Sequence, residues 1–153
     1  MKEELTIKPL AGFGCVKFGA TRNDIQDVYG EPQEVENIKG EAGESDAEAW
    51  NYWDKGHTFF FEQDSDNLCT CIETDNDEAT LFDKNVFVLS EAQIIKLMND
   101  NGFSDLDTED EEWGERRVSF NDAVVDFYFE DDNLISVSWG VIADENDKYN
   151  WPE

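Results

Sequence analysis

The side chains best suited to catalysis are few in this sequence. His57 is the single histidine, so any acid or base chemistry near neutral pH would have to be built around it. The cysteines Cys15, Cys69 and Cys71 have neither a second histidine nor metal-finger spacing, which predicts structural thiols and not a nucleophile or a zinc site. The sequence also has no glycine-rich loop of the type that holds phosphate. We therefore expect no catalytic residue, no metal and no cofactor.

Carboxylates are abundant, but their spacing matches no metal or catalytic motif. Residues 64–67 (Asp-Ser-Asp-Asn) resemble the start of a calcium loop, and residues 75–78 add oxygens nearby. The glycine at the sixth loop position and the glutamate at the twelfth are missing, so a specific calcium site is not expected. With 38 acidic residues, neighbouring pairs arise by chance and do not indicate a glycosidase-type pair.

The charge balance restricts the class of partner. The chain has 38 acidic and 11 basic residues, a formal net charge of -27. Such a charge repels nucleic-acid phosphates and anionic lipid headgroups. It attracts a basic protein and speeds the association of the two. We expect the partner to be another protein with a basic surface, and neither nucleic acid nor a membrane; the alternative is a merely soluble acidic surface.

The length and the hydropathy pattern suit one compact domain. At 153 residues with 13% aromatic content, the chain can bury a core without a metal or a disulfide. Residues 1–7 lack the apolar core of a secretory signal, and no stretch approaches the roughly 20 apolar residues of a membrane span. An odd number of cysteines fits a reducing compartment. We expect a cytoplasmic protein, or an envelope protein if a leader has been removed.

Two segments have the signals of a helix with both ends marked. In the first, Thr21 can accept a hydrogen bond from the backbone of the first turn, and Gly30 ends the helix. In the second, Ser90 and Gln93 can form a capping box, and Gly102 supplies the stop.

Each helix opens a half in which similar segments recur in one order: an acidic loop, a tryptophan, an aromatic triplet and an Asp-Asn-Leu turn. In the two halves these are residues 39–46 and 104–112, Trp50 and Trp113, residues 59–61 and 127–129, and residues 66–68 and 132–134. The recurrence predicts a duplication within a single domain (1–153), with repeats at about residues 8–75 and 79–142. We expect an α+β fold in which two tandem helix-plus-three-stranded units form one antiparallel sheet with helices on one face.

Strand alternation sorts the side chains by face. The inner face, under the helices, is predicted to include His57, Cys69, Cys71 and Ile135. The outer face mixes aromatic anchors with polar and acidic neighbours, which is typical of a protein-binding surface. Its candidate partner-binding residues are Trp53, Phe60, Glu62, Ile72, Arg117, Asp126, Tyr128 and Glu130. Alternatively, the aromatic residues only stabilise the sheet through cross-strand pairs, or residues 144–153 cover them.

A resemblance to known modules follows from the first helix signal. The segment from Phe18-Gly19-Ala20-Thr21 to Tyr29-Gly30-Glu31-Pro32, followed by paired strands, resembles the helix-and-sheet modules of bacterial outer-membrane assembly lipoproteins of the SmpA/OmlA type. Duplicated, the arrangement is similar to the β-lactamase inhibitor protein family, in which two such modules present a concave sheet to a partner. The resemblance spans most of residues 8–142 and implies a binding role, such as that of a bacterial immunity-type protein.

The sequence therefore favours a non-enzymatic protein-binding module, an immunity protein or inhibitor that occludes a basic toxin or enzyme. In this hypothesis acidic loops steer the partner, while Trp53, Phe60 and Tyr128 provide buried contacts. Two alternatives stay open. One is an envelope-associated scaffold or accessory module, and the other is a hydrolase-type enzyme acting through His57 or clustered acids.

Overall fold

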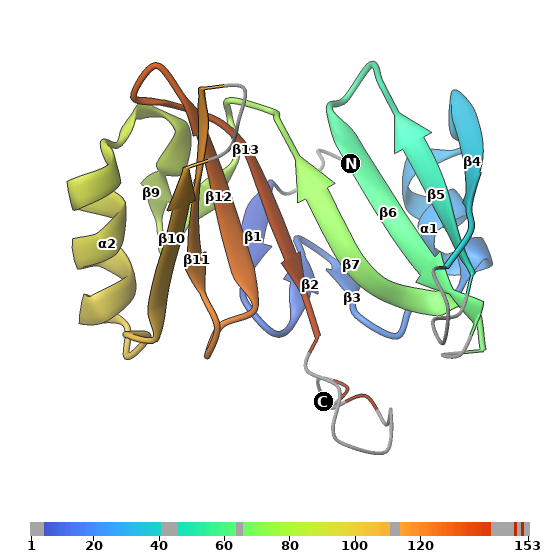
Figure 1. The fold of residues 1–153 in the computed structure, drawn as a ribbon. Helices are drawn as coiled ribbons and strands as arrows, with labels where there is room; N and C mark the ends of the chain where they lie inside the picture. The colour runs from blue at the N-terminus through green and yellow to red at the C-terminus, as the bar shows by residue number, and fades with distance from the viewer. Residues whose placement is uncertain are drawn as a thin grey trace.

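The computed structural model describes residues 5–40, 46–63, 66–110 and 114–141, together with Tyr149 and Trp151. The chain folds into two β-sheets and a few short helices (Figure 1). The helices are α1 (Arg22–Tyr29), η2 (Val86–Val88, a 3-10 turn) and α2 (Glu91–Asp100).

Both α-helices begin where the sequence predicts. Thr21 Oγ1 accepts from the backbone N–H of Asp24 at 3.1 Å, and Ser90 Oγ accepts from that of Gln93 at 3.2 Å. The side chains of Asp24 and Gln93 accept in return from the two cap N–H groups, so both capping boxes are closed. Gly30 ends α1 with a φ of 77°, a conformation that favours glycine. The predicted caps are confirmed.

The large sheet has eight strands, all antiparallel, in the order β10-β11-β12-β13-β7-β6-β5-β4. Each half of the chain supplies a four-stranded meander, and the last strands of the two meanders, β7 and β13, pair at the centre. The strands are β4 (Glu34–Ile38), β5 (Ala47–Tyr52), β6 (His57–Glu62), β7 (Leu68–Thr74), β10 (Leu106–Asp110), β11 (Glu115–Phe120), β12 (Val125–Glu130) and β13 (Asn133–Gly140).

The small sheet joins the N-terminal segment to the middle of the chain. Its order is β3-β2-β1-β8-β9, and β1 pairs with β8 in parallel. Its strands are β1 (Thr6–Lys8), β2 (Gly12–Phe13), β3 (Val16–Lys17), β8 (Thr80–Leu81) and β9 (Lys84–Asn85).

The predicted α+β fold, two helix-plus-three-stranded units in one antiparallel sheet with helices on one face, is wrong. The molecule is mostly β, with two sheets, and each half gives the large sheet four strands. The additional strands, β4 and β10, are edge strands whose residues are all exposed. Leu106–Asp110 falls inside the segment that was predicted to be an acidic loop. The strand was missed because acidic residues are uncommon in strands.

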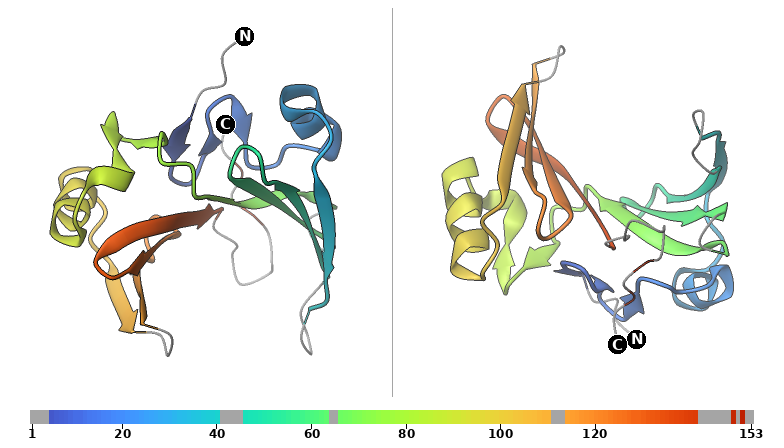
Figure 2. Two further views of the ribbon diagram at one scale, coloured as in Figure 1. Left: turned by 90° about the horizontal axis from the view of Figure 1, so that it is seen from above. Right: turned by 60° about the horizontal axis from the view of Figure 1, so that its bottom comes forward.

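The large sheet is strongly curved (Figure 2, left). The helices and the small sheet lie on its convex side, and the core lies between these layers. The Phe13 ring of β2 meets those of Trp139 and His57 edge-on, with centroids 5.4 and 4.7 Å apart. Trp139 Nε1 donates to the carbonyl oxygen of Gly12 at 2.8 Å, so a buried hydrogen bond also joins the two sheets. The other side of the large sheet is called the concave face below.

In both halves a β-bulge changes which residues point to the core, so some of the predicted face assignments are wrong. The register shifts between Phe60 and Phe61, so that Phe60 lies opposite Cys71 and Phe59 opposite Ile72. Ile72 is therefore fully buried in the core, and its assignment to the partner-binding face is wrong. Cys71, predicted to point inward, lies on the concave face beside Ser138, with 3.5 Å between Sγ and Oγ. An uninterrupted alternation puts both residues on the wrong side.

The second half has the equivalent bulge between Tyr128 and Phe129. Phe129 lies opposite Leu134, which is buried, while Ile135, predicted to point inward, is 37% exposed. Alternation holds again after the bulge, since Val137 is fully buried.

Candidate functional site

A row of polar side chains crosses the concave face from one edge of the large sheet to the other. It has one residue on each of the eight strands, and each residue is in register with the next. We call this set the polar row: Asp107, Ser119, Asp126, Ser138, Glu73, Thr58, Asn51 and Glu34. The pairing of Ser138 with Glu73 joins the contributions of the two halves.

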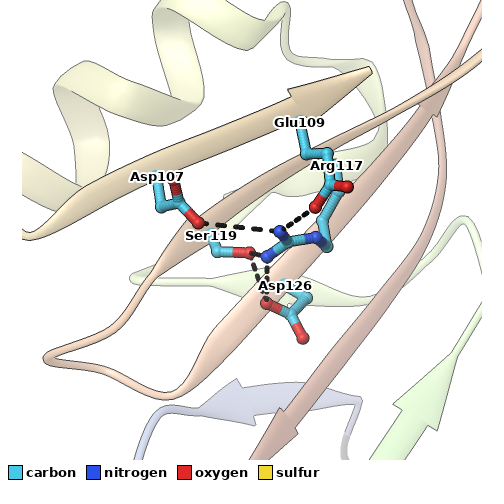
Figure 3. Close-up of polar contacts among 5 residues, drawn as sticks. All are labelled: Asp107, Glu109, Arg117, Ser119 and Asp126. Atoms are coloured by element: carbon cyan, nitrogen blue, oxygen red, sulfur yellow. Dashed lines mark hydrogen bonds and ion pairs between the residues drawn. The ribbon is translucent and has the colours of Figure 1, made fainter. Parts of the chain in front are cut away.

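In the second half, one arginine, Arg117, forms ion pairs with carboxylates of the row (Figure 3). Arg117 Nη2 lies 2.7 Å from Glu109 Oε2 and 3.6 Å from Asp107 Oδ2. Its Nη1 donates to Ser119 Oγ, which in turn donates to Asp126 Oδ1. The hydrogen bond that Arg117 donates to Glu109 and the charge of Asp126 raise the pKa of Arg117, although partial desolvation opposes them. Three carboxylates therefore share one guanidinium.

In the first half, the row borders a hollow of about 250 Å³. Trp53, which is 60% exposed, and Phe60 give it aromatic walls, and Ala49 is a small buried residue in its lining. Carboxylates of Glu36, Glu73 and Asp75 also face it, and the remaining lining residues are Ile38, Asn51, Gly56 and Thr58. The hollow thus combines aromatic, apolar and anionic surface.

Asn51 organises the polar groups of this hollow. Its side chain is buried, with Nδ2 donating to Glu36 Oε1 at 2.7 Å and to Glu34 Oε1 at 3.3 Å. Its Oδ1 accepts from Thr58 Oγ1 at 2.8 Å. A neutral amide therefore satisfies these carboxylates without cancelling their charge.

The electrostatics of the concave face reflect its excess of carboxylates. Burial raises the pKa of Glu73, and the charges of Asp75 and Glu115 raise it further. The neighbouring carboxyl group of Glu36 raises the pKa of Glu34, whereas the hydrogen bond from Asn51 lowers it. A bound cation would relieve both sources of repulsion.

The predicted partner-binding residues fall into three groups. Trp53 and Phe60 line the hollow. Arg117 and Asp126 belong to the ion-pair network, and Tyr128 lies opposite Arg117 in register. Burial raises the pKa of the Tyr128 hydroxyl.

The remaining candidates lie at strand ends or in the core. Glu62 ends β6 and accepts a 2.6 Å hydrogen bond from the Tyr149 hydroxyl, and Glu130 is exposed at the end of β12. Ile72 is in the core. The suggestion that residues 144–153 cover the face falls largely outside the described residues. Of those residues, Tyr149 contacts Glu62, and Trp151 stacks on Tyr149 and lies against Gly19.

Of the eight residues of the polar row, only Asp126 was among the candidate partner-binding residues. Asn51 and Glu73 were not among the candidates, nor were Glu34 and Asp107 on the edge strands. Correct strand pairing is the signal that finds them, because the row is a property of register and not of any local motif.

Of the residues considered for catalysis, His57 and Cys69 are buried in the core, and Cys71 lies on the concave face beside Ser138. His57 is buried, as strand alternation predicts, and its Nδ1 lies 2.8 Å from Thr74 Oγ1. Cys69 is fully buried, and burial raises the pKa of its thiol well above the ordinary range. Burial likewise raises the pKa of the Cys71 thiol to about 11. Over the described part of the chain, no group of three or more His, Cys, Asp or Glu side chains is arranged to hold a metal ion.

A larger hollow, of about 720 Å³, lies beside the start of α2. Its arginine, Arg116, is already held by Glu91 at 2.7 Å and by Asp110 at 3.0 Å. None of the predicted partner-binding residues lines it. The concave face is therefore the better candidate. Within the described ranges, neither α-helix is long and apolar enough to cross a membrane.

Comparisons with known proteins add little to this description. No family model matches the chain, and no curated protein matches it. Among solved structures, the chain is similar to an extracellular protein containing a SCP domain from Bacillus anthracis str. Ames, at 12% sequence identity and a TM-score of 0.49. The match covers 80% of this chain and 43% of that one, so the chain spans less than half of that protein's length. A likeness this distant carries no argument about function.

Proposed function

We propose that this protein is a non-enzymatic binding module that holds a basic protein on its concave face, in the manner of an inhibitor or an immunity-type protein. The observation that carries the proposal is the polar row. It gives a curved, eight-stranded surface four carboxylates, those of Asp107, Asp126, Glu73 and Glu34, in one continuous line.

Charge supports a basic partner. The net charge of -27 produces a long-range field that speeds the encounter with a cationic protein, and the carboxylates of the concave face give that field a local target. The dependence on charge predicts an association rate that falls as salt is added.

Aromatic side chains on the same face support a lasting contact. Trp53 and Phe60 line the hollow of the first half, and Tyr128 lies in the second half beside the Arg117 network. Aromatic residues surrounded by polar groups are common hot spots, because they bury a large area at little entropic cost.

The test compares two double variants. Tagged wild-type protein is used to capture partners from the host at low salt, and a captured protein is then purified and its Kd measured. With Phe60→Ala/Tyr128→Ala, we expect a loss of about 2 kcal/mol or more, or about 30-fold or more in Kd, if either residue is a hot spot. The matched control is Val28→Ala/Val88→Ala, which truncates two exposed apolar residues on α1 and η2. Circular dichroism checks that both variants fold.

The proposal predicts a captured protein with a basic surface that binds the control variant like the wild type. An acidic partner would contradict it. So would a partner that binds the Phe60→Ala/Tyr128→Ala variant as tightly as the wild type.

A further inference from the structure

The two halves of the large sheet fill one equivalent position with different side chains. Arg117 on β11 lies opposite Glu109 on β10 and Tyr128 on β12. Its equivalent on β5 is Ala49, which lies opposite Glu36 on β4 and Phe60 on β6. The second half therefore has an internal guanidinium where the first half has a methyl group.

In both halves, the side chains around this position nevertheless have oxygen atoms that can accept hydrogen bonds. Arg117 is surrounded by Glu109, Asp107, Ser119 and Asp126. The residues at the corresponding register positions around Ala49 are Glu36, Glu34, Asn51 and Thr58. The first half thus keeps most of an arginine site and lacks the arginine.

Two properties of the first half fit an unfilled arginine site. Among the described residues, no lysine or arginine is ion-paired with Glu34 or Glu36, and the amide of Asn51 is their shared donor. The hollow next to Ala49 measures about 250 Å³, below the roughly 300–1,000 Å³ of pockets that hold small molecules. Its size suits a single long side chain better than a free ligand.

We propose that this hollow receives an arginine side chain of the partner protein, in the place that Arg117 fills in the second half. This inference rests on the proposed function, because the arginine would come from the bound partner protein. A guanidinium has five donors in a planar fork, which suits the carboxylates of Glu36 and Glu73, and its flat face can stack on Trp53 or Phe60. A lysine ammonium has a single point of charge and lacks the planar face.

The test uses three capped tripeptides, with arginine, lysine or the neutral isostere citrulline at the centre, titrated into the whole 15N-labelled protein. We expect the arginine peptide to give saturable shifts of the Asn51 side-chain amide and the Trp53 indole signals. We expect the lysine and citrulline peptides to bind at least about tenfold more weakly, because neither has a charged planar fork. Equal binding of all three peptides, or of arginine and lysine, would overturn the proposal.

Two variants report on the hollow itself. Ala49→Arg should supply the guanidinium from within and weaken peptide binding at least about tenfold, as should the gentler change Glu36→Gln, which removes one exposed carboxylate. The amide spectrum of each variant shows whether it folds like the wild type. If both folded variants bind the arginine peptide as the wild type does, the hollow is not its site.

Arg117→Ala provides the positive control. Removing the internal guanidinium should open a second arginine site, seen as additional peptide-induced shifts at Ser119 and Tyr128. If Arg117→Ala gains these shifts while the hollow of the wild type gives none, the inference is wrong although the method works. None of these titrations needs the natural partner, so their failure is separate from that of the Phe60→Ala/Tyr128→Ala comparison.

Discussion

At the scale of a single residue, Glu73 shows how the acidic concave face affects stability. It is half-buried at the centre of the polar row, and within the described residues its carboxylate forms no hydrogen bond or ion pair. Burial and the charges of Asp75 and Glu115 raise its pKa above the ordinary value of 4.5. Between the two pKa values the folded protein binds more protons than the unfolded chain, so this residue lowers the free energy of unfolding as pH rises through that interval.

The replacement Glu73→Gln should therefore stabilise the protein near pH 7. The advantage should disappear as pH falls below about 4.5, where the carboxyl group is neutral in both states. Urea unfolding followed by tryptophan fluorescence at several pH values measures the difference. Glu130→Gln, at an exposed strand end, is the control, and we expect it to change little at any pH. A Glu73→Gln variant less stable than the wild type at neutral pH would contradict this assignment.

The same central position shows what sequence could predict of the site. Trp53, Phe60, Arg117, Asp126 and Tyr128 were found from residue type and alternation, and they do lie along the concave face. Glu73 was not found, because it belongs to the polar row only through its register with Thr58 and Ser138. These residues become its neighbours only when β7 pairs with β6 and β13. Alternation within one strand contains no information about those pairings.

At the scale of the element, the two bulges decide which residues reach the core. Ile72 lies opposite Phe59 and is fully buried, whereas Ile135, next to the second bulge, is 37% exposed. Truncating the first residue leaves a cavity, and truncating the second leaves a surface gap that water fills.

Ile72→Ala should cost about 2–5 kcal/mol in the free energy of unfolding, and Ile135→Ala about 0.5 kcal/mol. The pair is matched in chemistry, and the faces predicted without the bulges would give the opposite order. Chemical unfolding of the two variants under one set of conditions is sufficient. Equal losses would contradict the burial that the bulges impose.

Elements with strong local signals were predictable, and those without were not. Thr21 and Ser90 mark the starts of the helices, because each hydroxyl accepts a hydrogen bond from the backbone N–H only three residues later, a contact that the local sequence determines. β4 and β10 were missed because every residue in them is exposed, which removes the alternation of polar and apolar residues that identifies a strand. The short strands of the small sheet gave no signal either, since two or three residues cannot show a period.

For the whole molecule, the opposing effects of salt can be weighed from the charges. Added salt screens favourable pairs, such as Arg116 with Glu91 and Arg117 with Glu109, and it also screens the mutual repulsion of a chain with a net charge of -27. Exposed ion pairs contribute little each, and the chain has only 11 basic residues to form them. Repulsion should therefore dominate, so that salt stabilises the fold.

Raising NaCl from about 0.01 to 0.15 M shortens the screening length from about 30 to 8 Å. We expect a gain of about 1 kcal/mol in stability, which moves Tm by about 2–4 °C in a chain of this size. The internal control is the same salt series near the isoelectric point of about 4.1, where the net charge vanishes and the gain should vanish with it. Thermal unfolding by circular dichroism measures both series. A Tm that falls with salt near pH 7 would show that the ion pairs, including the Arg117 network of the concave face, outweigh the repulsion. The acidic surface would then be balanced within the molecule, and the electrostatic attraction of a basic partner would lose its main support.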